Sequence, residues 1–317
     1  MIFEKQVLNS FRSGFLIRCD DLGTARYFSH GDFPGLEAEP FSFPSSVGHT
    51  LQGWFYHYGN PIPGRILVFD HGFGGGHRSY MKEIELLCRH GFLVFAYDHT
   101  GCMCSGGENI RGFSQSLRDL NDCLKALKAS DRCQGLDISV MGHSWGGFST
   151  LNICALHPEI SHIVVLSGFV SVDDLVDQFF SGLLKGYRKA VKALDPNPEY
   201  VHYDAVTSLS GTGAQVLLVY SANDKLVNKA VHFDALKAGL SHKENIRFLL
   251  EENKGHNPNY TADAVAYLGQ YSADVAKKKK SLTTQEAKKA YRDSWDWDRM
   301  TEQDERVWAE IFKTLDA

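Results

Sequence analysis

The sequence has no apolar stretch long enough to cross a membrane. A transmembrane helix needs about 18 or more apolar residues in a row, and none of the 317 residues belongs to such a run. The first residues, Met1–Gln6, lack the basic segment followed by an apolar core that marks a secretory leader. We therefore expect no membrane partner and no export signal.

Positive charge and paired cysteines are also scarce. The 33 lysines and arginines against 38 acidic residues give a net charge of −5, which argues against a nucleic-acid partner. The basic run at 277–280 is typical of a solvated stretch after a helix. The seven cysteines are scattered, and the close pair Cys102 and Cys104 lacks redox or zinc spacing. Free thiols and a cytoplasmic location are expected.

Signatures of nucleotide binding are absent. The sequence contains neither G-x-x-x-x-G-K-[ST] nor a G-x-G-x-x-G in the matching strand–helix context. No ligand cluster suggests a metal, and we expect no metal and no organic cofactor.

What the sequence does contain is a serine between a strand and a helix. Residues 142–146 read G-x-S-x-G around Ser144, a β-type run precedes them at 136–141, and 147–158 is typical of a helix ended by proline. The pattern alone is permissive, but this context is that of a nucleophile elbow, whose strained turn presents the serine hydroxyl. Gly142 and Gly146 allow the two backbones to pass closely. The helix N-terminus offers N–H groups to an oxyanion.

An acid and a base follow, each just after a predicted strand. The strand at 214–221 runs into a polar turn with Asp224, and the strand at 246–251 leads to His256. Alone, Asp224 would be read as a turn residue and His256 as one of fourteen histidines. Ligands bind at the carboxyl ends of the strands in an open parallel sheet. Together with Ser144, the two residues predict a catalytic triad.

A third element completes this pattern. The strand at 66–70 ends in His71-Gly72 and a glycine-rich turn at 74–76. With these motifs, the chain from about residue 40 to its end resembles the α/β-hydrolase superfamily, in particular its serine esterases and serine aminopeptidase-like hydrolases. The resemblance implies an α/β fold: a mostly parallel twisted sheet, helices on both faces and a small helical cap. It also implies an oxyanion hole formed by the backbone N–H groups of Phe73 and Trp145.

One loop departs from the superfamily pattern. Many relatives carry Asp-x-Arg-Gly-x-Gly-x-Ser-x-Gly after their fourth strand. Here the loop at 98–107 has Thr100 in place of the arginine and Met103 in place of the second glycine. The departure touches no triad residue, but it makes the shape of the pocket near this loop harder to infer.

The order of the predicted elements agrees with the resemblance. Residues 1–40 are an N-terminal extension with a possible strand at 13–19, and 41–317 form the hydrolase domain. A hairpin is predicted at 41–58, followed by alternating strands (65–70, 92–98, 137–141, 160–167) and helices (79–90, 113–129). This alternation predicts a parallel sheet covered on both faces.

The alternation breaks at about 168–212. Apolar residues between 172 and 191 follow helical spacing, and Ser171 with Asp174 looks like a capping box at the start. α/β-Hydrolases commonly insert a cap here, and we expect Phe179, Phe180 and Tyr187 to line an acyl pocket. The alternative is a surface helix packed on the core. Helices are further predicted at 260–275 and 284–294, with a last one after a capping box of Thr301 and Asp304.

The resemblance implies a serine hydrolase that cleaves the carboxylic ester of a small or medium acyl substrate through an acyl-enzyme. Other acyl chemistries use the same triad, so peptidase or amidase, thioesterase and acyltransferase activities remain alternatives. A third hypothesis is a catalytically silent binding protein of the same fold. The sequence makes no prediction of the oligomeric state.

Overall fold

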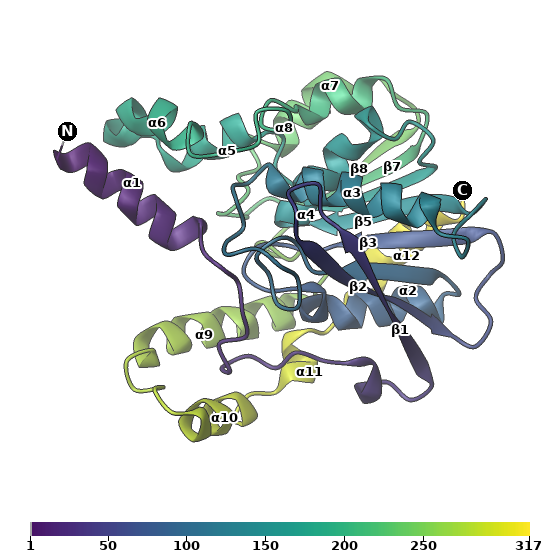
Figure 1. Cartoon of the computed structure of the whole chain (residues 1–317), viewed down its shortest axis with the longest axis horizontal. Helices are drawn as coiled ribbons and strands as arrows, with labels where there is room; N and C mark the ends of the chain where they lie inside the picture. Colours follow the sequence, from purple (N-terminus) through teal and green to yellow (C-terminus); the bar gives the residue numbers. More distant parts are fainter. Residues whose placement is uncertain (1) are drawn as a thin grey trace.

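The computed structural model describes residues 2–317, which surround one central sheet of eight strands (Figure 1). The strand order is β1-β2-β4-β3-β5-β6-β7-β8. β2 pairs antiparallel with both β1 and β4, and the remaining neighbours pair in parallel. The strands are β1 (Leu36–Pro44), β2 (Thr50–Tyr58), β3 (Arg65–Asp70), β4 (Leu93–Tyr97), β5 (Asp137–His143), β6 (His162–Leu166), β7 (Gln215–Ser221) and β8 (Ile246–Glu251). The predicted hairpin and parallel sheet are confirmed.

The parallel strands β3 to β7 are buried on both faces, as their branched apolar residues predict, whereas the edge strand β8 is only partly buried. In β3, Ile66 and Val68 belong to one hydrophobic cluster, and Leu67 and Phe69 belong to another, because successive side chains point to opposite faces. The first cluster is covered by α3 (Gln115–Ala129), α4 (Ser144–Asn152) and α8 (Phe233–Leu240). The second is covered by α2 (Met81–Arg89) and α12 (Glu305–Leu315). This arrangement confirms the expected layers.

The N-terminal residues form a helix, α1 (Ile2–Phe15), and the strand expected at 13–19 is wrong. Within 13–19, only Cys19 has a strand-like pairing, which is an isolated parallel β-bridge to Cys102. The apolar residues Val7, Leu8, Phe11 and Phe15 share one helical face, and this face packs against the first hydrophobic cluster. In Figure 1, α1 stands beside α5 and α6 rather than on the sheet.

The segment at 168–212 is helical but interrupted. It contains α5 (Val172–Phe179), a short 3₁₀ helix η4 (Gly182–Tyr187), α6 (Arg188–Lys192) and α7 (Ala205–Ser210). The Ser171 side chain accepts the N–H of Asp174 at 3.0 Å, as the capping box predicts. The helical spacing does not give one long helix, because Gly182 adopts a left-handed conformation with φ of +59°.

The chain ends in four helices, of which three lie together below the sheet in the view of Figure 1 and the last packs on a face of the sheet. These are α9 (Ala262–Lys278), α10 (Gln285–Asp293), α11 (Trp297–Met300) and α12, and three short 3₁₀ helices occur elsewhere: η1 (His30–Asp32), η2 (His77–Tyr80) and η3 (Ile153–Ala155). Asp304 is the N-cap of α12, whereas Thr301 ends α11, so the predicted capping box begins three residues too early. Within 2–317, no helix combines the length and apolarity that crossing a bilayer requires.

Candidate active site

Ser144 occupies the turn between β5 and α4 with a φ of +56°. A non-glycine residue in this left-handed region carries strain of about 1–3 kcal/mol, and such strain is concentrated at functional sites. A Cβ at Gly142 would overlap the Thr150 side chain and the Gly146 carbonyl, and a Cβ at Gly146 would overlap the Asp70 carbonyl. The glycines are therefore required by close backbone contact, and the turn has the geometry of the predicted elbow.

The structure brings together the three side chains that the sequence singled out. The Ser144 hydroxyl lies 2.8 Å from Nε2 of His256, and Nδ1 of His256 lies 2.7 Å from Oδ2 of Asp224. Because a carboxylate only accepts hydrogen bonds, Nδ1 carries the proton and Nε2 is left to accept the serine hydroxyl. The Asp224 side chain is fully buried, whereas the His256 side chain is 18% exposed. The imidazole of His256 therefore borders a solvent-accessible space.

The environment of Asp224 keeps it ionised. Burial raises its pKa, but the hydrogen bond and charge of His256, with the N–H groups of Val227 and Leu226, outweigh burial and hold the pKa below its usual value. Those two N–H groups lie 3.1 and 2.8 Å from Oδ1. The carboxylate thus has fixed donors on one oxygen and the imidazole on the other.

The two loops that carry Asp224 and His256 are tied to each other. Asn223 accepts the N–H of Gly255 at 2.8 Å, and the Ser221 hydroxyl accepts the N–H of Lys254 at 3.0 Å. The Lys254 ammonium in turn contacts Asp304 at 2.5 Å, at the start of α12. The position of the His256 loop therefore depends on the C-terminal helix.

His143 and Tyr80 link the elbow to the neighbouring loops. The backbone carbonyl of His256 accepts a hydrogen bond from Nε2 of His143 at 2.7 Å, and Nδ1 of His143 accepts from the Tyr80 hydroxyl at 2.8 Å. Burial lowers the pKa of His143 to about 3, so the ring stays neutral and each nitrogen has one role. The Tyr80 hydroxyl also accepts the N–H of Gly72 at 3.1 Å. Sequence patterns gave no sign of this connection, because Tyr80 lies in none of the motifs.

The glycine-rich turn approaches the elbow from β3. His71 is buried, its Nε2 accepts the N–H of His99 at 2.9 Å, and its Nδ1 lies 2.7 Å from the carbonyl of Gly72. The Phe73 ring packs edge-on against Trp145 with centroids 6.2 Å apart. No acceptor for the N–H of Phe73 occurs within the described residues. The first N–H groups of α4, including that of Trp145, have no intrahelical acceptor.

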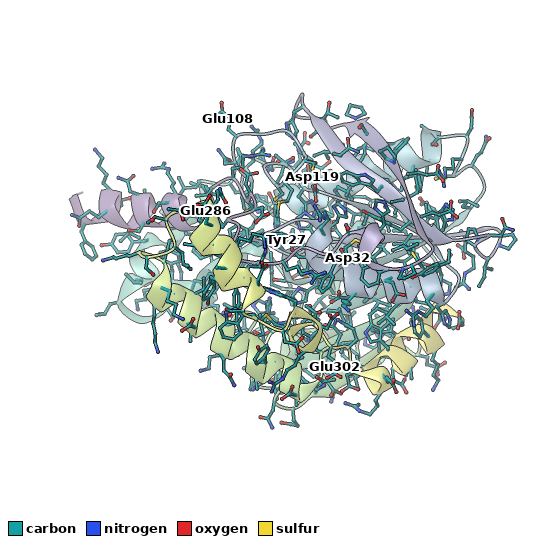
Figure 2. All side chains as sticks on the ribbon, turned by 90° about the horizontal axis from the view of Figure 1, so that it is seen from below. Tyr27, Asp32, Glu108, Asp119, Glu286 and Glu302 are labelled. Atoms are coloured by element: carbon teal, nitrogen blue, oxygen red, sulfur yellow. The ribbon has the colours of Figure 1, made fainter. Side chains whose placement is uncertain are left out.

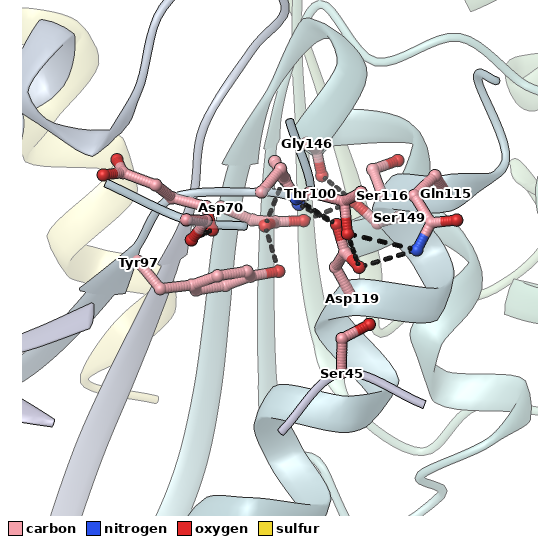
Figure 3. A network of polar contacts seen from close by, with 12 residues as sticks. Ser45, Asp70, Tyr97, Thr100, Gln115, Ser116, Asp119, Gly146 and Ser149 are labelled. Atoms are coloured by element: carbon pink, nitrogen blue, oxygen red, sulfur yellow. Dashed lines mark hydrogen bonds and ion pairs between the residues drawn. The ribbon is translucent and has the colours of Figure 1, made fainter. Parts of the chain in front are cut away.

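A buried polar network supports the elbow from below (Figure 3). The hydroxyl of Tyr97 donates to Asp70 at 2.8 Å, and the hydroxyl of Ser149, in α4, donates to the other oxygen of Asp70. Asp70 is the last residue of β3, so these bonds join the strand that precedes the glycine-rich turn to α4, which begins at Ser144. The relative positions of the turn and the elbow are fixed from inside the fold.

The same network explains the unusual loop at 98–107. Thr100 donates its backbone N–H and its hydroxyl to Asp119 at 2.7 and 2.8 Å. His99 lies between Asp70, at 2.9 Å, and Asp119, at 3.3 Å. Burial lowers the pKa of His99, but the two carboxylates raise it to about 9. Thr100, where relatives have arginine, therefore anchors the loop inward.

The three aromatic residues expected in a cap lie against the N-terminal helix. Phe179 stacks on Phe15 with centroids 5.8 Å apart, Phe180 lies 5.9 Å from Phe11, and Tyr187 lies 5.8 Å from Phe3. Phe180 is only 8% exposed. Phe15 in turn lies 6.1 Å from Phe73 of the glycine-rich turn. Sequence reasoning missed α1 as a neighbour of the site, although the spacing of its apolar residues was a usable signal.

Comparisons with known proteins identify the family of this chain. A family model described as serine aminopeptidase, S33, matches residues 61–254. A monoacylglycerol lipase of Mycolicibacterium smegmatis is 29% identical over 182 residues, which are 56% of this chain and 60% of that protein. Human monoglyceride lipase is 28% identical over 132 residues, which are 40% of this chain and 43% of that protein. The chain thus spans less than two thirds of these relatives.

Solved structures show the same fold at low identity. An esterase of Pyrococcus furiosus superposes with a TM-score of 0.60 and 18% identity, covering 84% of this chain and 98% of that one. An acylaminoacyl peptidase of Pyrococcus horikoshii gives a TM-score of 0.56 and 16% identity, covering 78% of this chain and 42% of that one. The expected α/β-hydrolase fold is confirmed.

Proposed function

Because this chain belongs to the serine aminopeptidase S33 family of α/β-hydrolases, we propose that it is a serine hydrolase that cleaves a carboxylic ester. The observation that carries the proposal is the continuous hydrogen-bonded series from Ser144 through His256 to Asp224, at 2.8 and 2.7 Å. The relatives named lipase and esterase support an ester as the substrate.

The proposed reaction has two acyl-transfer steps. Nε2 of His256 takes the proton of the Ser144 hydroxyl as the oxygen attacks the acyl carbonyl carbon. The resulting imidazolium is stabilised by Asp224, whose carboxylate stays ionised. The imidazolium then protonates the leaving alcohol, which departs and leaves an acyl-serine. Water, deprotonated by the same nitrogen, attacks this ester and releases the acid.

The developing oxyanion would be bound by the N–H groups of Phe73 and Trp145. The open N–H of Phe73 and the N-terminal position of Trp145 in α4 support this assignment. Losing one such donor typically costs about 2.7–4 kcal/mol of barrier. The ties from Tyr80 to Gly72 and His143 keep the turn and the elbow in register.

We place the acyl group of a small or medium substrate beneath the segment at 168–212, which acts as the cap. The aromatic side chains of Phe179 and Phe15, stacked next to Phe73, support an apolar acyl site at this position. Phe180 and Tyr187 support the same roof through their contacts with α1.

A panel of substrates tests the proposal. p-Nitrophenyl esters of increasing acyl length, aminoacyl p-nitroanilides and acyl thioesters are compared on the wild type and on Ser144→Ala. The proposal predicts ester hydrolysis that Ser144→Ala abolishes. Preferential cleavage of the anilides would favour the second candidate, a peptidase, to which the description of the family model points.

We also propose a cytoplasmic location. All seven cysteines are free thiols, and six of them are buried. The backbones of Cys19 and Cys102 pair in an isolated β-bridge, yet their sulfur atoms form no disulfide. This fits a reducing compartment. Fractionation of cells that express the full chain tests this location, and recovery in an oxidising compartment would contradict it.

A further inference from the structure

A cavity of about 460 Å³ opens beside the glycine-rich turn, away from the cap. Three segments line it: the N-terminal stretch at 22–27, Gly74 of the turn, and the helices α9 and α10 with their connection. Its volume lies within the range of small-molecule sites, about 300–1,000 Å³. Figure 2 shows Tyr27, one of its walls, next to these helices. The N-terminal and C-terminal walls both lie outside the 61–254 region that matches the family model.

The cavity lies next to the turn of the proposed oxyanion hole, because Gly74 is one of its lining residues. Gly74 directly follows Phe73, and consecutive Cα atoms are about 3.8 Å apart. The Tyr27 ring lies against the same turn, because a Cβ placed on Gly75 would be 3.8 Å from Cε1 of Tyr27. The cavity is therefore within reach of a medium-length substrate chain whose carbonyl is held at Phe73.

The walls of the cavity are mostly apolar. Val275, Leu282 and the rings of Tyr27 and Tyr271 contribute to them. The Tyr271 hydroxyl donates to the carbonyl of Thr24 at 3.1 Å, which holds the N-terminal stretch onto α9. Leu22, at the lining, is 69% exposed, so an apolar side chain faces solvent there without a protein partner. An apolar chain would cover it.

Two lysines give the cavity a positive rim. Lys279 and Lys288 line it, and neither pairs with a carboxylate in the part of the chain that the structure describes. Their sequence neighbours do pair: Lys278 lies 2.9 Å from Asp274, and Lys289 lies 2.5 Å from Asp293.

The surroundings of the rim include acidic groups as well. Asp21 lies on the N-terminal stretch, and its carboxylate accepts the N–H of Gly23 at 2.6 Å. Glu286 lies on the exposed side of α10 (Figure 2). The Lys288 stem lies along Gly23, where an added Cβ would be 3.4 Å from its Cδ. The two ammonium groups without acid partners are thus available to a carboxylate from outside.

We propose that this cavity is a second substrate subsite, which binds an apolar chain that ends in a carboxylate. The inference rests on the proposed ester hydrolysis and names its substrate class: an ester that carries a carboxylate at the far end of a medium-length chain. The chain belongs either to the alcohol, with the acyl group beneath the cap, or to the acyl group, in which case this cavity takes the place of the acyl site proposed beneath the cap. Both chains share the chemistry that the cavity recognises.

Paired substrates test the subsite. On the acyl side, the p-nitrophenyl ester of 7-carboxyheptanoate is compared with p-nitrophenyl octanoate. On the alcohol side, the acetate ester of 8-hydroxyoctanoate is compared with octyl acetate. Each is assayed with the wild type, with Lys279→Gln/Lys288→Gln, and with the matched control Lys280→Gln/Lys289→Gln, whose lysines do not line the cavity.

On one of the two sides, we expect the wild type to prefer the carboxylated ester. The Lys279→Gln/Lys288→Gln variant should lose about five- to tenfold in kcat/KM through KM, as two exposed ion pairs imply. Rates on the neutral esters should stay within about twofold, and added salt should reduce the preference. The control variant should behave as the wild type.

Two results would overturn the subsite. One is equal kcat/KM for carboxylated and neutral esters on both sides; the other is the same loss in the control variant. Either result leaves Ser144-dependent hydrolysis of the neutral esters intact, so the proposed function would survive. If no ester is hydrolysed, the proposed function fails instead.

Binding gives a readout that does not depend on turnover. Methyl hydrogen suberate is titrated calorimetrically into Ser144→Ala, alone and combined with Ala276→Trp, which fills the cavity. Ala273→Trp, at an exposed position on the same helix outside the lining, is the control. We expect the Ala276→Trp combination to abolish binding and the Ala273→Trp combination to keep it. Binding that survives Ala276→Trp, or no binding to Ser144→Ala itself, contradicts the subsite.

Discussion

The hydroxyl of Tyr80 lies 2.8 Å from Nδ1 of His143, the residue immediately before the candidate nucleophile. The same hydroxyl accepts the N–H of Gly72, and His143 donates to the backbone carbonyl of His256. One tyrosine therefore connects the nucleophile elbow, the turn of the proposed oxyanion hole and the loop of the proposed base. Tyr80 is a positioning residue in this account, since it acts through its neighbours.

Tyr80→Phe is expected to lower kcat about tenfold with a smaller change in KM, because the turn and the elbow lose their common anchor. Leaving the N–H of Gly72 without an acceptor also costs about 1–3 kcal/mol of stability. Tyr58→Phe is the matched control, since it removes a hydroxyl that donates to Glu85 at 2.9 Å, in contact with α2. An unchanged kcat in Tyr80→Phe would contradict the positioning role of Tyr80.

The three triad residues are expected to fail as a unit. Asp224→Asn should lower kcat by about 10⁴-fold, because an asparagine no longer holds the His256 imidazole in the tautomer with its proton on Nδ1. Ser144→Ala combined with His256→Ala should be hardly worse than either change alone. Asp204→Asn is the control, because Asp204 caps α7 by accepting the N–H of Thr207. Effects that multiply in the double variant would show that a residue is misassigned.

Alanine substitutions of the aromatic residues in the proposed cap are expected to have different effects. Phe179→Ala should shift the preferred acyl chain length, since each methylene in an apolar pocket is worth about 1–3 kcal/mol of discrimination. Phe15→Ala should act in the same direction through the stack with Phe179. Phe180→Ala should instead lower the free energy of unfolding by about 3–5 kcal/mol, because the Phe180 side chain is only 8% exposed. Ester-length profiles and melting temperatures on all three variants check this, and an unmoved profile would contradict the cap.

Glu83 makes stability depend on pH. It is 1% exposed in α2, and burial raises its pKa from the usual 4.5 to about 7 although Asn259 donates to it. As pH rises from about 4.5 to 7, the unfolded chain releases this proton before the folded one does, so stability falls over this window. Above that window, the free energy of unfolding is lower by on the order of 3 kcal/mol.

Glu83→Gln keeps the neutral form at every pH and should remove this loss. Urea unfolding should find the variant more stable than the wild type at about pH 8 and similar to it at about pH 5. Glu286→Gln, an exposed change on α10, is the control. A wild type that is more stable than Glu83→Gln at about pH 8 would contradict the assignment.

Local patterns in the sequence were sufficient to predict the central sheet and the positions of Ser144, Asp224 and His256. Each of these residues follows a strand of the parallel part of the sheet, and parallel strands present their carboxyl ends at one edge, so proximity follows from topology. The 2.8 and 2.7 Å contacts agree with that argument. Their catalytic roles stay predictions until they are tested.

Other parts depend on contacts between distant segments, which local patterns do not specify. The stretch at 13–19 is apolar enough for a strand, but Phe11 and Phe15 find partners in the cap and the core, and that packing favours a helix. Likewise, nothing near Tyr80 in the sequence points to His143, and the two are 63 positions apart. The sequence does not predict the interruption of the helix at Gly182, which follows from the left-handed backbone conformation of this glycine.

Covalent labelling tests the central claim most directly. The full chain is treated with a fluorophosphonate, which reacts with serines activated by a base, and the modified peptide is identified by mass spectrometry. The account predicts one adduct, on Ser144, that disappears in Ser144→Ala and is strongly slowed in His256→Ala. An absence of labelling in the folded wild type, or an adduct on another serine, would contradict it.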